Sequence, residues 1–313
     1  MTMLTAVTSP KFLRAALPGA SFAILLAAIF YVQPRAMSYF GLNLMLQYAV
    51  PIALATIAQM FIITVNDLDL SIGAFVGLTA TIGATLVAST PLLGALALLA
   101  AIAAYGALGA LVHWRNLPSI VVTLGMSFVW LGVAVLILPT PGGSAPGWVK
   151  AIMGLKTPWV PFPVVAALVI GIVVHVFLMM SSYGAVLRGA GGNPRAVSRA
   201  GWSLLKIKVI MYSAAGFFGV LSGLSLIGLT SAADAHIADR YTLYAIAGVI
   251  LGGGEFVGGR VSPFGAVVGA LTLTLTGSFL IFLKISPDWQ IGAQGAVLIV
   301  VLALRALIKR REV

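Results

Sequence analysis

The stretch Val65-Asn66-Asp67-Leu68-Asp69-Leu70-Ser71-Ile72-Gly73 places two carboxylates, an amide and a hydroxyl between two long apolar segments. The flanking apolar segments cover residues 41–65 and 71–89. An α-helix rises about 1.5 Å per residue, so roughly 20 apolar residues cross the hydrocarbon core of a membrane, which is about 30 Å thick. The stretch therefore predicts a polar interruption between two membrane spans.

Apolar segments of this length recur along all 313 residues. The chain is 61% hydrophobic and 8% charged, whereas a soluble domain has about 45–50% apolar and about 25% charged residues. Such a chain cannot cover a water-facing surface, and we expect an all-α, polytopic transmembrane bundle in a single domain, residues 1–313. Breaks at Pro, Gly and charged residues divide it into about ten predicted spans, at residues 16–33, 41–65, 71–89, 91–112, 119–138, 160–180, 208–230, 241–252, 264–283 and 289–307.

The eighth predicted span, residues 241–252, is too short to cross the membrane alone. It runs into Gly252, Gly253 and Gly254, which favours a broken or re-entrant element. Backbone of this kind is tolerated at membrane depth where protein or water satisfies its polar groups.

The Lys and Arg residues predict the orientation of the chain. With ten spans and a cytoplasmic N-terminus, the C-terminus is cytoplasmic too, and thirteen of the eighteen basic residues lie inside, as the positive-inside rule requires. We therefore interpret the net charge of +11 as a topology signal rather than a nucleic-acid-binding surface. The inside residues are Lys11, Arg14, Arg115, Arg188, Arg195, Arg199, Lys206, Lys208, Arg260, Arg305, Lys309, Arg310 and Arg311, and the outside ones are Arg35, Lys150, Lys156, Arg240 and Lys284.

Two predicted loops differ in chemistry. Residues 139–159 are rich in Pro, Gly and Trp, which is typical of an external loop with aromatic side chains at the membrane interface. Residues 181–208 form the longest predicted cytoplasmic loop and carry five basic residues. We expect a short helix at its centre, with Asn193 as the N-cap and Pro194 at the first helical position.

The pattern GAxVG occurs twice, at residues 73–77 and 265–269, each time near the start of a predicted span. Small residues four positions apart let helix backbones approach closely in lipid. Chance in a Gly-rich membrane sequence and a duplicated half both explain the repeat, and duplicated halves are common in transporters.

Signatures of catalysis are missing from the sequence. It has no GxxxxGK[ST] phosphate-binding loop, no HExxH and no GxSxG. It also lacks cysteine, and His113, His175 and His236 lie in different segments, so no metal site is expected. The chain is therefore predicted not to be an enzyme and to need no cofactor, and any ATP hydrolysis must come from another polypeptide.

Three of the seven carboxylates lie away from the external ends and the tail: Asp67, Asp69 and Glu255. Asp69 or Ser71 is suited to cap the helix that follows, where a carboxylate also meets the positive end of the helix dipole. The alternative is contact with a substrate or cation at a broken helix. Glu255 is five residues before Arg260, a spacing that favours an internal ion pair.

Three stretches together resemble the ribose-type permeases of bacterial ABC sugar importers. NDLDLSIG at residues 66–73 is similar to the GGIDLSVG segment of that family. GGNPRAVSRAG at 191–201 is similar to the cytoplasmic coupling segment GxNxxAAxxxGI, and LGGGEFVGGRVSP at 251–263 to the turn LGGxSLxGGRGS. Their order and spacing match over nearly the whole chain.

Some positions depart from the family pattern. Asn66 replaces a Gly, Trp202 replaces an aliphatic residue, and Glu255-Phe256 replaces a small polar residue and Leu. These departures bear on which substrate the protein takes more than on the family that it resembles.

The resemblance implies a permease of the bacterial inner membrane that works with partners. These are an ATP-binding subunit on the cytoplasmic face, an external solute-binding protein, a second permease copy or paralogue, and membrane lipid. The residues implied to couple the permease to the ATPase are Gly191, Gly192, Asn193, Pro194, Ala196, Ala200 and Gly201. Structural turns are expected at Asp67, Asp69, Ser71, Gly73, Gly252, Gly253, Glu255, Gly258, Gly259 and Arg260.

The sequence indicates the solute less clearly than the class of protein. Neutral polyols need hydrogen-bonding groups rather than charges, and aromatic faces commonly stack on sugar rings. The candidate pathway residues, which are equally suited to bond neighbouring helices, are Asn43, Gln47, Gln59, Thr64 and Asn66. One rival hypothesis is a secondary transporter in which Asp67, Asp69 or Glu255 binds protons or sodium. A membrane-embedded enzyme or scaffold is the other.

Overall fold

The computed structural model describes residues 10–256 and 258–286, with the side chains of residues 10–16 left out, and a few positions between Trp289 and Ile299. Within this part the chain is α-helical, and its only β pairing is an isolated bridge between Gly142 and Ala233. The α-helices are α2 (Pro10–Val32), α3 (Tyr39–Leu46), α4 (Ala49–Thr64), α5 (Ile72–Ile82), α6 (Pro91–Trp114), α7 (Ser119–Ile137), α8 (Gly147–Met153), α9 (Phe162–His175), α10 (Ser182–Gly192), α11 (Pro194–Arg199), α12 (Leu204–Thr230), α13 (Tyr241–Leu251) and α14 (Pro263–Phe282).

The all-α prediction is confirmed for the described residues. Five helical segments are long and apolar enough to cross a membrane: α6, α7, α9 with its π-helical extension Val176–Met180, α12 and α14. Helices α3 and α4 meet at a bend of 42°, and they add a sixth membrane-crossing segment if they form one span. The predicted span at 289–307 falls almost wholly outside the described residues.

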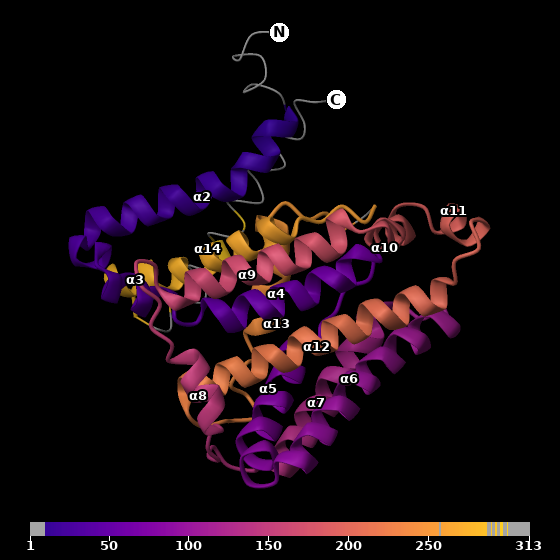
Figure 1. Cartoon of the computed structure of the whole chain (residues 1–313), viewed down its shortest axis with the longest axis horizontal. Coiled ribbons are helices and arrows are strands. Elements are labelled where there is room, and N and C mark those ends of the chain that lie inside the picture. Colours follow the sequence, from indigo (N-terminus) through magenta and orange to yellow (C-terminus); the bar gives the residue numbers. More distant parts are fainter. Residues whose placement is uncertain are drawn as a thin grey trace.

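The helices form two adjoining groups (Figure 1). One contains α2, α4, α9, α13 and α14, and the other contains α5, α6, α7 and α12. Helices α4 and α12 pack against each other and join the two groups. Helices α10 and α11 lie at one end of the molecule, here called the α11 end, while α3 and α8 lie at the opposite end, here called the α3 end.

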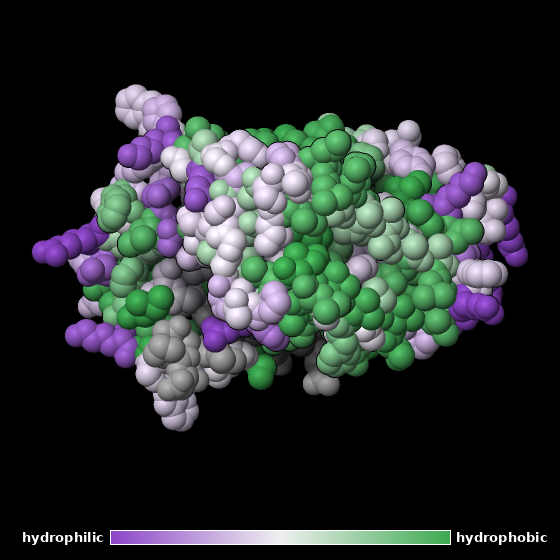
Figure 2. All heavy atoms as spheres, turned by 90° about the horizontal axis from the view of Figure 1, so that it is seen from below, coloured by the Kyte–Doolittle hydropathy of each residue, from purple (hydrophilic) through white to green (hydrophobic). Residues whose placement is uncertain are grey.

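A hydrophobic band crosses the middle of one face of the molecule. Figure 2 shows hydrophobic residues across its centre and hydrophilic residues concentrated toward its two ends. On α7 the exposed side chains include Val121, Phe128 and Leu136, which is 82% exposed. A water-facing helix does not present such a surface, whereas a lipid-facing helix does.

Helix α4 forms the centre of the bundle, since all of its residues are buried. A helix that is apolar on every side is stable only where other helices or lipid surround it. Here α12, α13, α14 and α9 all pack against α4. The end of α4 is therefore held rigidly, and the polar stretch that follows it starts from a fixed position.

Both GAxVG motifs pack against α13 or the residues just before it. A Cβ on either glycine of the 73–77 motif would overlap backbone or side-chain atoms of residues 235–242. A Cβ on either glycine of the 265–269 motif would overlap the backbone of α13 at residues 248–252. The glycines therefore permit close helix contact, as small residues do in membrane proteins. A duplicated origin stays a prediction.

This contact gives a first testable prediction. Gly269→Val would overlap the carbonyl oxygen of Gly248, and overpacking of this kind costs about 1–3 kcal/mol. Gly132→Val is the matched control, because nothing lies within 4 Å of a Cβ at Gly132 on α7. After heating in detergent, size-exclusion chromatography should show Gly269→Val unfolding several degrees below Gly132→Val. Equal unfolding temperatures would contradict the packing role.

Candidate functional site

The chain between α4 and α5, residues 65–71, is not helical and is here called the α4–α5 break. Its backbone groups lie inside the bundle, where an unpaired N–H or C=O is costly. Side chains from other helices satisfy several of them. The N–H of Leu68 donates to Ser119 Oγ at 3.0 Å and the N–H of Leu70 donates to Thr123 Oγ1 at 3.0 Å, both on α7.

Gln59 on α4 also binds the backbone of the α4–α5 break. It is fully buried, and with its amide oriented to satisfy both groups, its nitrogen donates to the Asp69 carbonyl at 3.1 Å and its oxygen accepts from the Asp69 N–H at 3.2 Å. The side chain thus replaces the partners that a continuous helix would have supplied. The structure places Gln59 in the packed interior, and its role in a solute pathway stays a prediction.

The carboxylate of Asp69 is fully buried and has several donors. It accepts from the backbone N–H of Ser71 at 2.6 Å, from Ser71 Oγ at 2.7 Å, and from the hydroxyl of Tyr105 on α6. The expectation that the side chain of Asp69 or Ser71 caps α5 was wrong. Ser71 is the N-cap residue, but its side chain accepts no hydrogen bond from α5, and the N–H of Gly73 donates instead to Thr242 Oγ1 on α13 at 2.9 Å.

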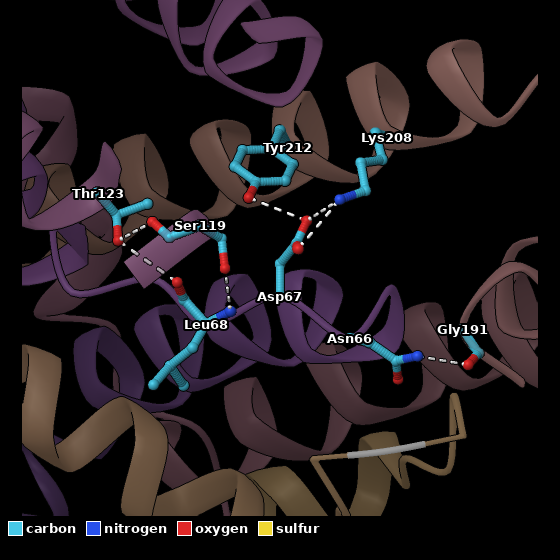
Figure 3. Close-up of polar contacts among 8 residues, drawn as sticks. All are labelled: Asn66, Asp67, Leu68, Ser119, Thr123, Gly191, Lys208 and Tyr212. Atoms are coloured by element: carbon cyan, nitrogen blue, oxygen red, sulfur yellow. Dashed lines mark hydrogen bonds and ion pairs between the residues drawn. The ribbon is translucent and has the colours of Figure 1, made fainter. Parts of the chain in front are cut away.

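Asp67 connects the α4–α5 break to α12 (Figure 3). One carboxylate oxygen lies 2.7 Å from Lys208 Nζ and also accepts from the Tyr212 hydroxyl at 3.1 Å. The side chains of Asp67 and Lys208 are 10% and 21% exposed, so the pair is largely shielded from water. A half-buried carboxylate of this kind needs a counter-charge, and Lys208 supplies it.

Asn66 joins the α4–α5 break to two distant segments. Its Nδ2 donates to the carbonyl oxygen of Gly191 at the end of α10, at 2.6 Å (Figure 3). Its Oδ1 accepts from the N–H of Gly258 at 3.0 Å. The φ angle of Asn66 is 60°, a left-handed conformation that Gly and Asn tolerate best. The three motifs that resemble one family in sequence therefore meet at this one amide.

The predicted short helix in the segment 181–208 is confirmed. Asn193 is its N-cap and accepts from the N–H of Ala196 at 3.0 Å, with Pro194 at the first helical position of α11. Residues 182–192 add a second helix, α10, that the sequence did not predict. Ala200 and Gly201 follow α11 on the surface, and Gly201 has a φ of 86°.

Gly191 lies against the end of α4. A Cβ at this position would overlap the carbonyl oxygen of Thr64, so only glycine permits this approach. Thr64 itself is fully buried, and its hydroxyl donates to the Met60 carbonyl at 2.7 Å. Gly191, near the end of α10, thus touches the last residue of α4 directly, next to the hydrogen bond from Asn66.

The expected ion pair in the glycine turn is confirmed. Arg260 Nη1 lies 3.7 Å from Glu255 Oε2, and the N–H of Glu255 donates to the Arg260 carbonyl at 2.9 Å. The turn also contains positive φ angles at Gly253, Gly258 and Gly259, which favour glycine. Gly259 lies against the carbonyl oxygen of Arg188 on α10, so this turn and α10 pack together.

A cavity of about 1120 Å³ opens at the α3 end and is here called the α3-end cavity. Gln47 is the one predicted pathway residue among those that line it; Asn43, Gln59, Thr64 and Asn66 do not. Their pathway roles stay predictions. The polar and aromatic residues that line the cavity are Gln33, Arg35, Ser38, Phe40, Gln47, Tyr48, Thr230, His236, Asp239, Arg240, Tyr241, Tyr244, Thr274, Ser278 and Phe282.

Comparison with known proteins assigns the family. Residues 41–302 match the family described as the permease component of the branched-chain amino acid transport system. The chain belongs to this family. The resemblance to ribose-type permeases of bacterial ABC sugar importers is confirmed, and this permease is a multi-pass membrane protein.

Three curated relatives match nearly the whole permease. The galactose/methyl galactoside import permease protein MglC of Salmonella typhimurium is 27% identical over 312 residues, which cover 91% of each chain. The ribose import permease protein RbsC of Bacillus subtilis is 29% identical over 278 residues, covering 84% of this chain and 83% of the relative. The D-allose transport system permease protein AlsC of Escherichia coli is 27% identical over 270 residues, covering 80% and 79%. No solved structure matches the permease.

Sequence reasoning missed the side chains that satisfy the α4–α5 break from a distance. Ser119, Thr123 and Thr242 are hydroxyl residues within apolar segments, and this was the only signal available for them. Lys208 was counted as a loop residue for topology, whereas it lies on α12 and pairs with Asp67. A lysine inside a helix of the permease that faces a carboxylate cannot be recognised without knowing the packing.

The two hydrogen bonds of Asn66 give a second prediction. Asn66→Gly keeps the left-handed backbone and removes only the amide, each hydrogen bond being worth about 0.5–1.5 kcal/mol. Hydrogen exchange measured by mass spectrometry should then speed up about ten-fold at residues 191–200. The matched control is Asn116→Gly, because Asn116 has a φ of 53° and is exposed after α6. Exchange at 191–200 that is the same in both variants would show that Asn66 does not hold this segment.

Proposed function

We propose that this permease is the membrane subunit of an ATP-driven, binding-protein-dependent importer for a neutral sugar or sugar-like polyol. It forms the translocation path as a dimer with a second copy or a paralogue. An ATP-binding subunit docks at the α11 end, and a solute-binding protein delivers the solute at the α3 end. The observation that carries the proposal is the direct contact between the coupling segment and the α4–α5 break, through Gly191 and Asn66.

This contact provides a mechanical input to a chain whose sequence has no phosphate-binding loop. Helix α11 is exposed, begins with a proline and is capped by Asn193, so it is a short rigid element at the surface. Its neighbour α10 ends against Thr64 at the centre of the bundle. A displacement of α11 by a partner would therefore reach α4 through packed atoms.

The proposed topology has ten spans with both termini in the cytoplasm and the α11 end inside. The distribution of described basic side chains supports it. Seven lie on α10 and α11, at the end of α6, at the start of α12 or in the turn before α14: Arg115, Arg188, Arg195, Arg199, Lys206, Lys208 and Arg260. Five lie before α3, on or after α8, before α13 or after α14: Arg35, Lys150, Lys156, Arg240 and Lys284. The external assignment of the α3 end also places the α3-end cavity where a delivered solute would enter.

The contacts of the three candidate carboxylates disfavour ion-gradient coupling. Asp67 is paired with Lys208, Asp69 accepts from Ser71 and Tyr105, and Glu255 is paired with Arg260. A proton- or sodium-binding carboxylate must exchange its partner during transport. These carboxylates instead join segments of the permease to each other.

Reconstitution separates the hypotheses. Proteoliposomes that hold the permease with the ATP-binding subunit and the binding protein of its own operon should accumulate D-ribose, D-galactose or D-allose when ATP is present. The permease alone should accumulate none of them under a proton or sodium gradient. Uphill uptake by the permease alone would establish the secondary transporter instead. L-Leucine serves as a competing solute, because the family description refers to branched-chain amino acids.

The docking surface gives a third prediction. Ala200 is exposed directly after α11, and Ala200→Asp places a charge where an ATPase subunit would pack. The variant should insert normally and bind the ATPase at least about ten-fold more weakly, a loss of about 1.4 kcal/mol of association energy. Copurification of the ATPase and ATP-driven uptake should both fall. Ala151→Asp on the exposed face of α8, at the opposite end of the permease, is the control for copurification of the ATPase. Ala200 is a cleaner site than Gly201, where any side chain also strains a positive φ.

If Ala200→Asp copurifies the ATPase as well as Ala151→Asp does, the α11 end is not the docking surface. Loss of copurification in both variants would show that an added carboxylate disturbs the permease generally.

A further inference from the structure

Charged and uncharged groups are separated within the α3-end cavity. Arg35, His236, Asp239 and Arg240 line it but are exposed, and the side chains of His236 and Asp239 are 58% and 56% exposed and paired with each other at 3.0 Å. In contrast, Tyr241 is only 7% exposed. Charges therefore surround the mouth of the cavity, while its buried part is uncharged.

Tyr241 presents a polar atom at the buried part of this cavity. It lines the cavity, and none of the hydrogen bonds among the described residues involves its hydroxyl, which is accessible at the cavity wall and not one of the sealed, unpaired atoms of the interior. An unpaired hydroxyl in a cavity wall is therefore a group available to a ligand.

Two further tyrosines accompany Tyr241. Tyr244, one helical turn later on α13, has its ring centroid 6.5 Å from that of Tyr241, with the planes inclined at 40°. Tyr48 lies at the bend between α3 and α4 and also lines the cavity. These three residues are here called the tyrosine cluster. Together they give the cavity an aromatic wall.

The other side of the cavity offers hydrogen-bond acceptors. Thr274 Oγ1 donates to the Ala270 carbonyl at 2.9 Å, and Ser278 Oγ donates to the Met45 carbonyl at 3.2 Å. Because each hydroxyl has one proton, which it donates to a carbonyl, both oxygens keep the capacity to accept a hydrogen bond. Gln47 also lines the cavity and adds an amide with two donors and an acceptor.

We propose that the tyrosine cluster, with Gln47, Thr274 and Ser278, is the site at which the permease holds a neutral monosaccharide on its way through the α3-end cavity. The inference rests on the proposed function and adds the place in the permease where the solute is held and the residues that select it. A monosaccharide ring has an apolar C–H face that suits an aromatic wall. Its hydroxyls both donate and accept, so they match the acceptors of Thr274 and Ser278 and the amide of Gln47.

An amino acid fits this site poorly. Its ammonium and carboxylate groups need counter-charges when water is removed, and the buried part of the cavity supplies none among the described lining residues. The charged side chains at the mouth are exposed to water and lie outside this buried part, so they do not pair with a ligand held there. The site therefore discriminates against zwitterions by leaving their charges unpaired, which is a stronger selection than shape alone.

The site is also next to the α4–α5 break. Thr242 lies between two residues of the tyrosine cluster on α13, and its Oγ1 accepts from the N–H of Gly73 at the start of α5. A shift of the α4–α5 break would thus move α13 and with it Tyr241 and Tyr244. This arrangement lets the coupling segment change the geometry of the sugar site.

Saturation-transfer difference NMR on the full permease in nanodiscs tests the site without any partner. The probes are D-ribose, D-galactose, D-allose and L-leucine. At least one of the three sugars should receive saturation, and L-leucine should not. Tyr241→Phe removes one hydroxyl and should weaken sugar binding about three- to ten-fold, the effect of one lost hydrogen bond. Gln47→Ala should weaken it at least as much.

Tyr183→Phe is the matched control, because Tyr183 packs on Trp202 near the α11 end. Unfolding temperatures of all variants establish that each is folded.

Equal sugar binding by Tyr241→Phe and Tyr183→Phe would overturn the site, as would L-leucine binding that is lost in Tyr241→Phe, or no sugar binding at all. If ATP-driven sugar uptake by the complete importer persists in that case, the proposed function survives and only the site is wrong. If sugar binds as expected but the complete importer shows no ATP-driven uptake, the site stands and the proposed function is wrong.

Discussion

The α4–α5 break imposes the constraint on which the rest of the structure depends. A helix that stops inside a membrane bundle leaves backbone N–H and C=O groups that no lipid can satisfy. Here hydroxyls and an amide from α4, α7 and α13 take the place of the missing helical hydrogen bonds, as with Gln59, Thr123 and Thr242. Each of these helices is thereby fixed to the same short stretch of chain.

The break in turn joins the two ends of the permease. On one side Gly191 of α10 touches Thr64, and Asn66 bonds both Gly191 and Gly258. On the other side Thr242 holds α13 to the start of α5. Short, packed connections of this kind transmit displacement because tightly packed groups cannot deform independently. The account of transport therefore needs no long-range signal beyond rigid contacts between neighbouring elements.

Local features of this site were predictable from the sequence, and distant ones were not. The Asn193 cap and the Glu255–Arg260 pair depend on residues within five positions of each other, so spacing alone indicated them. The pairing of Asp67 with Lys208 spans 141 positions, and only packing brings the two together. Gln59 illustrates the same limit, because its polarity was visible but the direction in which its amide points was not.

The most direct test of this account measures solute imported per ATP hydrolysed in proteoliposomes that hold the complete importer. Gly191→Ala forces α10 away from the Thr64 carbonyl, which the new Cβ would overlap, whereas a Cβ at Gly189 lies 3.2 Å from a methyl group of Val197, a much milder contact. If the contact at Gly191 carries the coupling, Gly191→Ala retains the ATPase and hydrolyses ATP, yet its import per ATP falls at least about ten-fold below that of Gly189→Ala. Equal import per ATP in the two variants would contradict the claim that the coupling segment drives transport through the α4–α5 break.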